Sequence, residues 1–157
     1  MRFSTITTAL SASSLASARI IGLAAPSTLA PNSTFSLTLL TENYIQSVAD
    51  VAVAWGFQTP TENNPTGYPY TLGSLKDSSY LGPEKSNTLS NVTIDATTPA
   101  TLEKGKDVVL SVAVMSLYGA SGGPITQAWN VTVHVGDEGS EDIVASREVG
   151  WKQSGDC

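Results

Sequence analysis

The sequence has little of the residue types on which metal sites and most covalent catalysis depend. Among its 157 residues there is one cysteine, Cys157, and one histidine, His134. A single cysteine excludes an intrachain disulfide, and a single histidine excludes every mechanism that needs two. The sequence contains no Cys/His metal set, phosphate-binding loop or dinucleotide fingerprint, so we predict neither a metal nor a cofactor. Cys157 either pairs between two chains, giving a dimer, or remains a free thiol.

Charge is also scarce, and basic charge most of all. Lys and Arg together number 8 against 14 Asp and Glu, which gives a formal net charge of −6. Nucleic acids and anionic membrane surfaces both require basic patches, so the balance argues against either as a partner. Beyond the N-terminal segment no run of about 18 apolar residues occurs, and we expect no membrane-spanning helix. Apolar residues make up 41% of the chain, which is enough for the core of one domain.

The N-terminal segment has the pattern of a secretory signal peptide. Residues 1–3 supply a basic start, residues 4–15 a mildly apolar stretch, and residues 16–18 (Ala-Ser-Ala) a small-x-small cleavage pattern. We therefore predict a signal peptide over residues 1–18 and a secreted mature chain that begins at Arg19.

Most of the remaining chain has the period-two hydrophobic pattern of half-buried β-strands. The alternating segments are residues 35–39, 51–57, 92–94, 110–114 and 129–135, and two shorter strands are expected near residues 20–23 and 79–81. Turns rich in Pro, Gly, Asn and Ser separate them, and residues 58–73 form a longer polar loop. About seven short strands predict an all-β fold, an immunoglobulin-like β-sandwich without an intrachain disulfide, over residues 19–146. A polar C-terminal tail follows over residues 147–157.

Three sequons are consistent with export. Asn32, Asn91 and Asn130 each begin an Asn-x-Ser/Thr triplet and are candidate N-glycosylation sites. Asn91 and Asn130 fall on the polar phase of their strands, so we expect both side chains to face solvent.

The catalytic pattern in the chain lacks its structural context. Residues 119–123 (Gly-Ala-Ser-Gly-Gly) match the G-x-S-x-G expression, but a nucleophile elbow needs a strand before it and a helix after it. Pro124 and another predicted strand follow instead, and that strand carries His134. We interpret residues 119–123 as a glycine-rich hairpin loop, predict no catalytic residue, and expect a protein that is not an enzyme.

The densest charge cluster is the acidic run at residues 137–142, Asp-Glu-Gly-Ser-Glu-Asp. It lacks the ligand spacing of a known calcium loop. It is therefore interpreted as a solvated turn or as a patch that contacts a partner.

Three segments of the chain are more specific than strand periodicity requires. Residues 39–48 are Leu-Leu-Thr-Glu-Asn-Tyr-Ile-Gln-Ser-Val, residues 80–87 are Tyr-Leu-Gly-Pro-Glu-Lys-Ser-Asn, and residues 116–120 are Ser-Leu-Tyr-Gly-Ala. The third is followed by Asn-Val-Thr-Val at 130–133 and Val-Gly-Asp at 135–137. In these strings, and over residues 20–146 as a whole, the chain resembles the necrosis-inducing secreted effector family of plant-associated fungi.

The resemblance implies a fungal effector, a virulence protein that acts by binding. Members of that family induce cell death in plants and bind a receptor-like co-receptor kinase and a receptor-like cytoplasmic kinase, which suppresses pattern-triggered immunity. It implies action in the host apoplast and the host cell. The C-terminal part of the family fold is linked to kinase binding, which corresponds here to residues 135–146. The candidate partner-binding residues are Asp137, Glu138, Glu141, Asp142 and Ile143.

Two other function classes stay open on the residues alone. One is a carbohydrate- or cell-wall-binding module without catalysis, whose usual mark is a flat row of exposed aromatic side chains. Trp55, Trp129 and Trp151 show no such row in the sequence. The other is a small hydrolase that uses Ser121.

Overall fold

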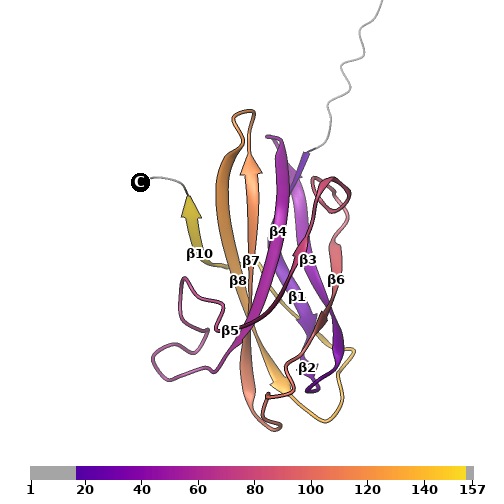
Figure 1. Ribbon diagram of the computed structural model, residues 1–157, viewed down its shortest axis with the longest axis vertical. Helices are drawn as coiled ribbons and strands as arrows, with labels where there is room; N and C mark the ends of the chain where they lie inside the picture. Colours follow the sequence, from indigo (N-terminus) through magenta and orange to yellow (C-terminus); the bar gives the residue numbers. More distant parts are fainter. Residues whose placement is uncertain (1–16, 155–157) are drawn as a thin grey trace, which may run out of the picture.

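The structure, a computed structural model, describes residues 17–154 and consists of β-strands in two layers (Figure 1). Most of the predicted signal peptide (residues 1–16) and Cys157, interpreted as either paired between chains or a free thiol, lie outside the described residues. No helix within the described part of the chain is long and apolar enough to cross a membrane. The strands are β1 (Ser17–Pro26), β2 (Thr28–Leu29), β3 (Thr34–Tyr44), β4 (Val48–Gln58), β5 (Ser74–Tyr80), β6 (Val92–Thr97), β7 (Asp107–Tyr118), β8 (Gly123–Val135), β9 (Ile143–Ser146) and β10 (Val149–Ser154), with one 3₁₀ turn, η1 (Pro83–Lys85).

The strands form two sheets that face each other across one core. The smaller sheet has the order β6-β3-β1-β9, and the larger has the order β10-β8-β7-β4-β5, with β2 pairing in parallel with β8. All other pairings are antiparallel. The predicted all-β, two-sheet architecture is confirmed, and it is consistent with an immunoglobulin-like sandwich.

The core lies between the sheets and follows the predicted alternation. Both Trp55 of β4 and Trp129 of β8 are almost fully buried in it. The inward positions of β3, β6, β7 and β8 are also buried, namely Phe35, Leu37, Leu39, Val92, Ile94, Leu110, Val112, Val114, Val131, Val133 and Val135. Burial of this apolar surface stabilises the fold by roughly 25 cal/mol for each Å² removed from water.

Strand β4 departs from the predicted alternation at its start. The register between β4 and β7 shifts between Asp50 and Ala52, which is a β-bulge at Val51. A bulge adds one residue to one strand and reverses the phase of the side chains before it. Val51, predicted to share the buried face with Val53, is therefore only half-buried, and Asp50 takes a buried position instead.

Within residues 17–154 the structure has ten strands where about seven were predicted. The additional ones include β2, β9 and β10, which are too short or too exposed to produce a recognisable alternation. The residues assigned to a polar tail contain β10, which pairs with β8 from Val149 to Ser154. At the other end β1 begins at Ser17, so Ser17 and Ala18 of the predicted signal peptide pair with β3.

The long loop between β4 and β5, residues 59–73, is attached to the larger sheet through the buried side-chain amide of Gln58. The side chain of Gln58 donates from Nε2 to the Thr71 carbonyl at 3.0 Å and to Ser111 Oγ at 2.8 Å. Its Oε1 accepts from the Tyr68 amide at 2.7 Å. The ring of Tyr70 packs against Trp151 of β10, with centroids 5.7 Å apart. The loop therefore covers the outer face of the sheet next to β10.

Candidate partner-binding surface

The acidic run forms most of the loop that joins β8 to β9 at one end of the sandwich. Backbone hydrogen bonds fix this loop to the chain between β1 and β2. The Ser27 amide donates to the Asp142 carbonyl at 2.7 Å, and the Ser140 amide donates to the Thr28 carbonyl at 3.0 Å. Ser140 Oγ accepts from the Thr28 amide at 3.0 Å and lies 2.9 Å from Ser27 Oγ. The acidic loop is thus held in one conformation by its own backbone.

Each of the four predicted acidic residues is exposed on this loop. Asp137 forms an ion pair with Lys104 at 2.6 Å, and the hydrogen bond from Lys104 lowers the pKa of this carboxyl. Within residues 17–154 no group of three or more His, Cys, Asp or Glu side chains is arranged to hold a metal ion. The loop presents Asp137, Glu138, Glu141 and Asp142 together at the surface, which fits contact with a basic partner surface.

Ile143, the fifth predicted residue, is the first residue of β9 and is 62% exposed. It pairs with Pro26 at the end of β1. An apolar side chain beside four carboxylates gives the loop a contact that does not depend on charge. The rest of the predicted region divides between core and surface, since Val135 is fully buried while Val144 packs partly against the core.

The G-x-S-x-G segment is a hairpin turn, as interpreted from the sequence. It joins β7 to β8, and the Gly122 amide donates to the Gly119 carbonyl at 3.2 Å. Both glycines have positive φ, which a tight turn requires and side chains disfavour. Ser121 is exposed at this end, whereas His134 lies at the opposite end of the same hairpin and contacts Asp107 at 2.8 Å. The structure does not bring Ser121 and His134 together.

The three sequons occupy different surroundings. Asn32 is exposed in the turn between β2 and β3, and Asn91 is exposed before β6, where its Oδ1 accepts from the Thr41 amide at 3.1 Å. Asn130 lies on the outward phase of β8 as expected, but the β4–β5 loop covers it. Its Nδ2 donates to the Thr66 carbonyl at 3.0 Å, and its Oδ1 is buried.

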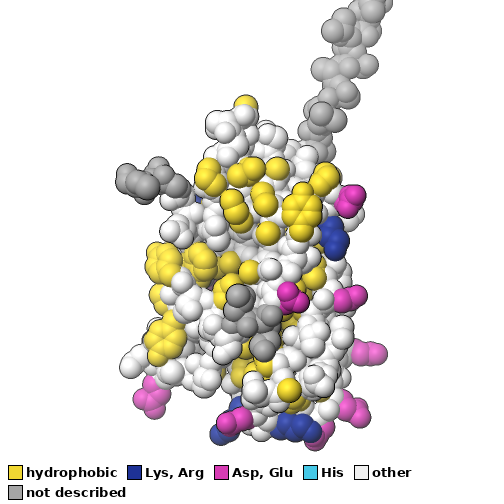
Figure 2. Space-filling model, in the orientation of Figure 1, with side chains coloured by type: hydrophobic (Ala, Val, Ile, Leu, Met, Phe, Trp, Pro, Cys, Tyr) yellow, Lys and Arg dark blue, Asp and Glu magenta, His cyan; other side chains and the backbone are white. Residues whose placement is uncertain are grey.

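A second surface was not anticipated from the sequence: an apolar patch on the outer face of the larger sheet. We call Ala49, Val51, Tyr80, Met115 and Leu117 the apolar face. Figure 2 shows uncharged, largely apolar side chains over this upper part of the sheet, while acidic side chains lie along the flank and lower end. Tyr80 is 71% exposed, and apolar groups gathered in this way mark protein contacts. The sequence feature that could have revealed this patch is the series of alanines at the outward positions of β4.

Beneath the apolar face lies Asp50, a carboxylate that is only 3% exposed. Ser116 Oγ donates to it at 2.6 Å, and Ser86 contacts both its carboxylate and its backbone amide. Burial raises the pKa of Asp50, and the hydrogen bonds from Ser116, the Asn87 backbone and Ser86 oppose the rise. Asp50 therefore joins β4 and β7 to the segment after η1. The sequence could not reveal this role because the partners are far apart along the chain.

Comparison with known proteins shows which family the sequence of this chain matches. Residues 16–134 match the family described as the Nis1 family. The chain is similar to "Necrosis-inducing secreted protein 1" of Colletotrichum higginsianum, with 47% identity over 133 residues that cover 85% of this chain and 89% of that protein. It is also similar to "Necrosis-inducing secreted protein 1" of Colletotrichum orbiculare, with 43% identity over 148 residues, 94% of this chain and 88% of that protein.

Proposed function

The chain belongs to the Nis1 family, and from this we propose that it is a secreted effector that binds and inhibits plant immune receptor-associated kinases without catalysis of its own. The observation that carries the proposal is the 47% identity, over most of both chains, to a necrosis-inducing secreted protein. At that identity proteins share a fold. A secreted, necrosis-inducing role follows at the level of the family, and kinase inhibition is the specific mechanism that we propose.

The proposed partners are a receptor-like co-receptor kinase and a receptor-like cytoplasmic kinase of the host. Binding would suppress pattern-triggered immunity, with the protein acting in the host apoplast and in the host cell. The rigid acidic loop supports this proposal. Four exposed carboxylates on a fixed backbone steer association toward a basic patch and fix its orientation, at little entropic cost on binding.

The test is binding of the purified mature chain, Arg19 onward, to the kinase domain of a plant immune co-receptor, with phosphotransfer measured in parallel. We expect saturable binding and reduced phosphorylation. Neutralising the loop with Asp137→Asn, Glu138→Gln, Glu141→Gln and Asp142→Asn should weaken binding about tenfold at low salt, mainly through slower association. The difference should shrink as salt screens the charges.

A matched control removes the same charge elsewhere. The substitutions Glu62→Gln, Asp77→Asn, Glu84→Gln and Asp95→Asn change four exposed acids outside the loop. This variant should bind almost as the wild type does. Equal weakening of both variants would show that net charge matters and the loop does not. Failure of the folded wild-type chain to bind the kinase domain would refute the proposal itself.

In the same assay Met115→Lys places a charge in the apolar face and tests that surface.

A carbohydrate- or cell-wall-binding function remains the second candidate because of one observation. The β4–β5 loop brings Tyr70 against Trp151 of β10, and Tyr70 and Tyr68 of this loop are both exposed. Stacking on sugar rings uses such aromatic faces. Retention of the wild-type chain, but not of Tyr70→Ala, on insoluble cell-wall glycans would favour this function over kinase binding.

A further inference from the structure

The edge of β1 changes character half-way along the strand. Leu23 and Ala24 of β1 are paired on both sides, with β3 and with β9, and β9 continues the pairing to Pro26. From Ser17 to Gly22, β3 is the only strand that pairs with it among the described residues. An unpaired strand edge offers main-chain donors and acceptors to another extended chain. The Ala18 amide already donates to Asn87 Oδ1 at 2.8 Å, so the open part of this edge is Arg19–Gly22.

Two local features open this edge. After Ser146 the chain leaves the smaller sheet and crosses through Arg147 to begin β10 on the larger sheet. In addition, the register of β1 with β3 shifts between Ile20 and Gly22, so that Ile21 is a bulge. Gly22 allows the crossing, because a side chain there would collide with the Ser146 carbonyl.

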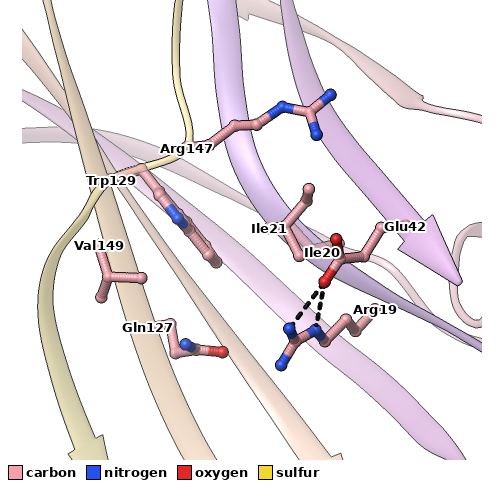
Figure 3. Close-up of a pocket in the computed structure, with 8 residues that line it drawn as sticks. All are labelled: Arg19, Ile20, Ile21, Glu42, Gln127, Trp129, Arg147 and Val149. Atoms are coloured by element: carbon pink, nitrogen blue, oxygen red, sulfur yellow. Dashed lines mark hydrogen bonds and ion pairs between the residues drawn. The ribbon is translucent and has the colours of Figure 1, made fainter. Parts of the chain in front are cut away.

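A groove of about 320 Å³ lies at this place, between β1 and the strands β8 and β10. We call it the edge groove, and its lining includes Arg19, Glu42, Gln127, Trp129 and Arg147. Figure 3 shows Arg19 joined to Glu42 at one end, Arg147 toward the other end, and Gln127 and Trp129 on the β8 side.

Hydrogen-bond donors dominate the lining. Arg19 donates from Nε and Nη2 to one oxygen of Glu42, at 2.9 and 2.7 Å, and stacks on the ring of Tyr44. Arg147 makes no hydrogen bond or ion pair within residues 17–154. The buried indole Nε1 of Trp129 also has no partner in the described part of the chain. Gln127 accepts from Tyr118 through Oε1, which leaves its amide nitrogen available.

Charge in the groove is opposite to that of the whole molecule. The chain carries a net charge of −6, yet two guanidinium groups face this groove against the single carboxylate of Glu42. Guanidinium groups prefer carboxylate and phosphate oxygens, which they bind in a bidentate geometry. A ligand that satisfies the lining must therefore bring acceptors and negative charge.

We propose that the edge groove binds an extended acidic segment of a partner protein, which adds to β1 as a strand in line with β9. Main-chain hydrogen bonds to Arg19–Gly22 would supply strand addition, and acidic side chains would meet Arg19 and Arg147. The inference rests on the proposed function only in that the chain acts by binding a protein. It adds a second contact, distinct from the acidic loop, that selects a partner segment of opposite charge.

The test uses three capped peptides that differ in charge and in their ability to pair as a β-strand. The probe is Thr-Val-Glu-Val-Glu-Val-Thr, one control replaces both Glu by Gln, and the other replaces the central Val by Pro and keeps both charges. Binding to the mature chain, Arg19 onward, is followed by NMR. We expect the probe to shift the amides of residues 19–22 and the indole N–H of Trp129. The Gln peptide should bind about threefold weaker for each charge pair lost, and the Pro peptide should not bind, because proline removes a ladder donor.

Protein variants separate the charge from the fold. Arg147→Gln removes one exposed cation of the groove and should weaken binding of the probe about threefold, the effect of one lost charge pair. Lys152→Gln removes the same charge from exposed β10 outside the groove and should bind the probe as the wild type does. Equal binding of the Pro peptide would overturn strand addition, and equal binding of the Gln peptide would overturn charge selection. Shifts confined to other surfaces would overturn the site.

Failure here and failure of the proposed function give different results. If the kinase domain binds and Arg147→Gln leaves that affinity unchanged while the probe does not shift residues 19–22, the edge-groove inference fails and kinase binding stands. If the probe binds as expected but the kinase domain does not, the groove stands and the partner belongs to another class of protein.

Discussion

Replacing Gln58 with leucine tests whether one buried amide holds the β4–β5 loop on the larger sheet. Gln58 is 6% exposed and makes three close hydrogen bonds, to Thr71, Ser111 and the Tyr68 amide. Leucine fills a similar volume but makes none of these bonds, each of which contributes about 1 kcal/mol. We therefore expect Gln58→Leu to lower the free energy of unfolding by about 3 kcal/mol. That is a large fraction of the stability of a domain of this size.

The assay is urea unfolding of four proteins: wild type, Gln58→Leu, Ser111→Ala and the double variant. Ser111→Ala alone should cost about 1 kcal/mol, because the Gln58 amide loses one acceptor. In the double variant that cost should disappear, giving a coupling of about 1 kcal/mol between the two residues. Limited proteolysis should also cut Gln58→Leu faster within residues 59–73. A loss below about 1 kcal/mol with unchanged proteolysis would refute the role assigned to Gln58.

Two further predictions concern Asp50 and the sequons. Burial raises the pKa of Asp50, so the folded protein holds this proton more tightly than the unfolded chain does. Its contribution to the free energy of unfolding should rise as pH falls through the raised pKa and level off below about 3.9. The difference between wild type and Asp50→Asn in urea unfolding should show this rise; a flat difference would contradict it. Mass spectrometry of protein secreted by a glycosylating host should find glycans at Asn32 and Asn91 only. A glycan on Asn130 in folded protein would contradict the contact with Thr66.

The larger part of the fold could be predicted because its strands are long and buried on one face. In β3 the residues Phe35, Leu37 and Leu39 alternate with polar ones, and the structure buries them. The bulge at Val51 could not be predicted, because no local sequence signal marks the position at which a strand contains one extra residue. Strand β9 was missed for another reason: four residues, alternately exposed and half-buried, carry too little pattern.

The candidate surfaces were predictable to the extent that they are local. The acidic loop is one continuous run, so its exposure followed from composition, and the structure places Asp137 and Asp142 at the surface as expected. The edge groove depends on Arg19 and Arg147, which come from opposite ends of the chain. The crossing from β9 to β10 brings Arg147 to the groove that Arg19 also lines. Neither arginine is distinctive within its own segment of sequence.

The crossing from β9 to β10 also governs the order in which the molecule can be completed during its synthesis. Of the described strands these two emerge last from the ribosome, and each pairs with a strand already made: β9 with β1, and β10 with β8. Until then one edge of β1 and one edge of β8 lack the strands that later pair with them. Pairings between distant parts of a chain form slowly, so the sandwich closes only after nearly all of it has been translated. The two sheets therefore stay incomplete until β9 and β10 have been made and add to β1 and β8.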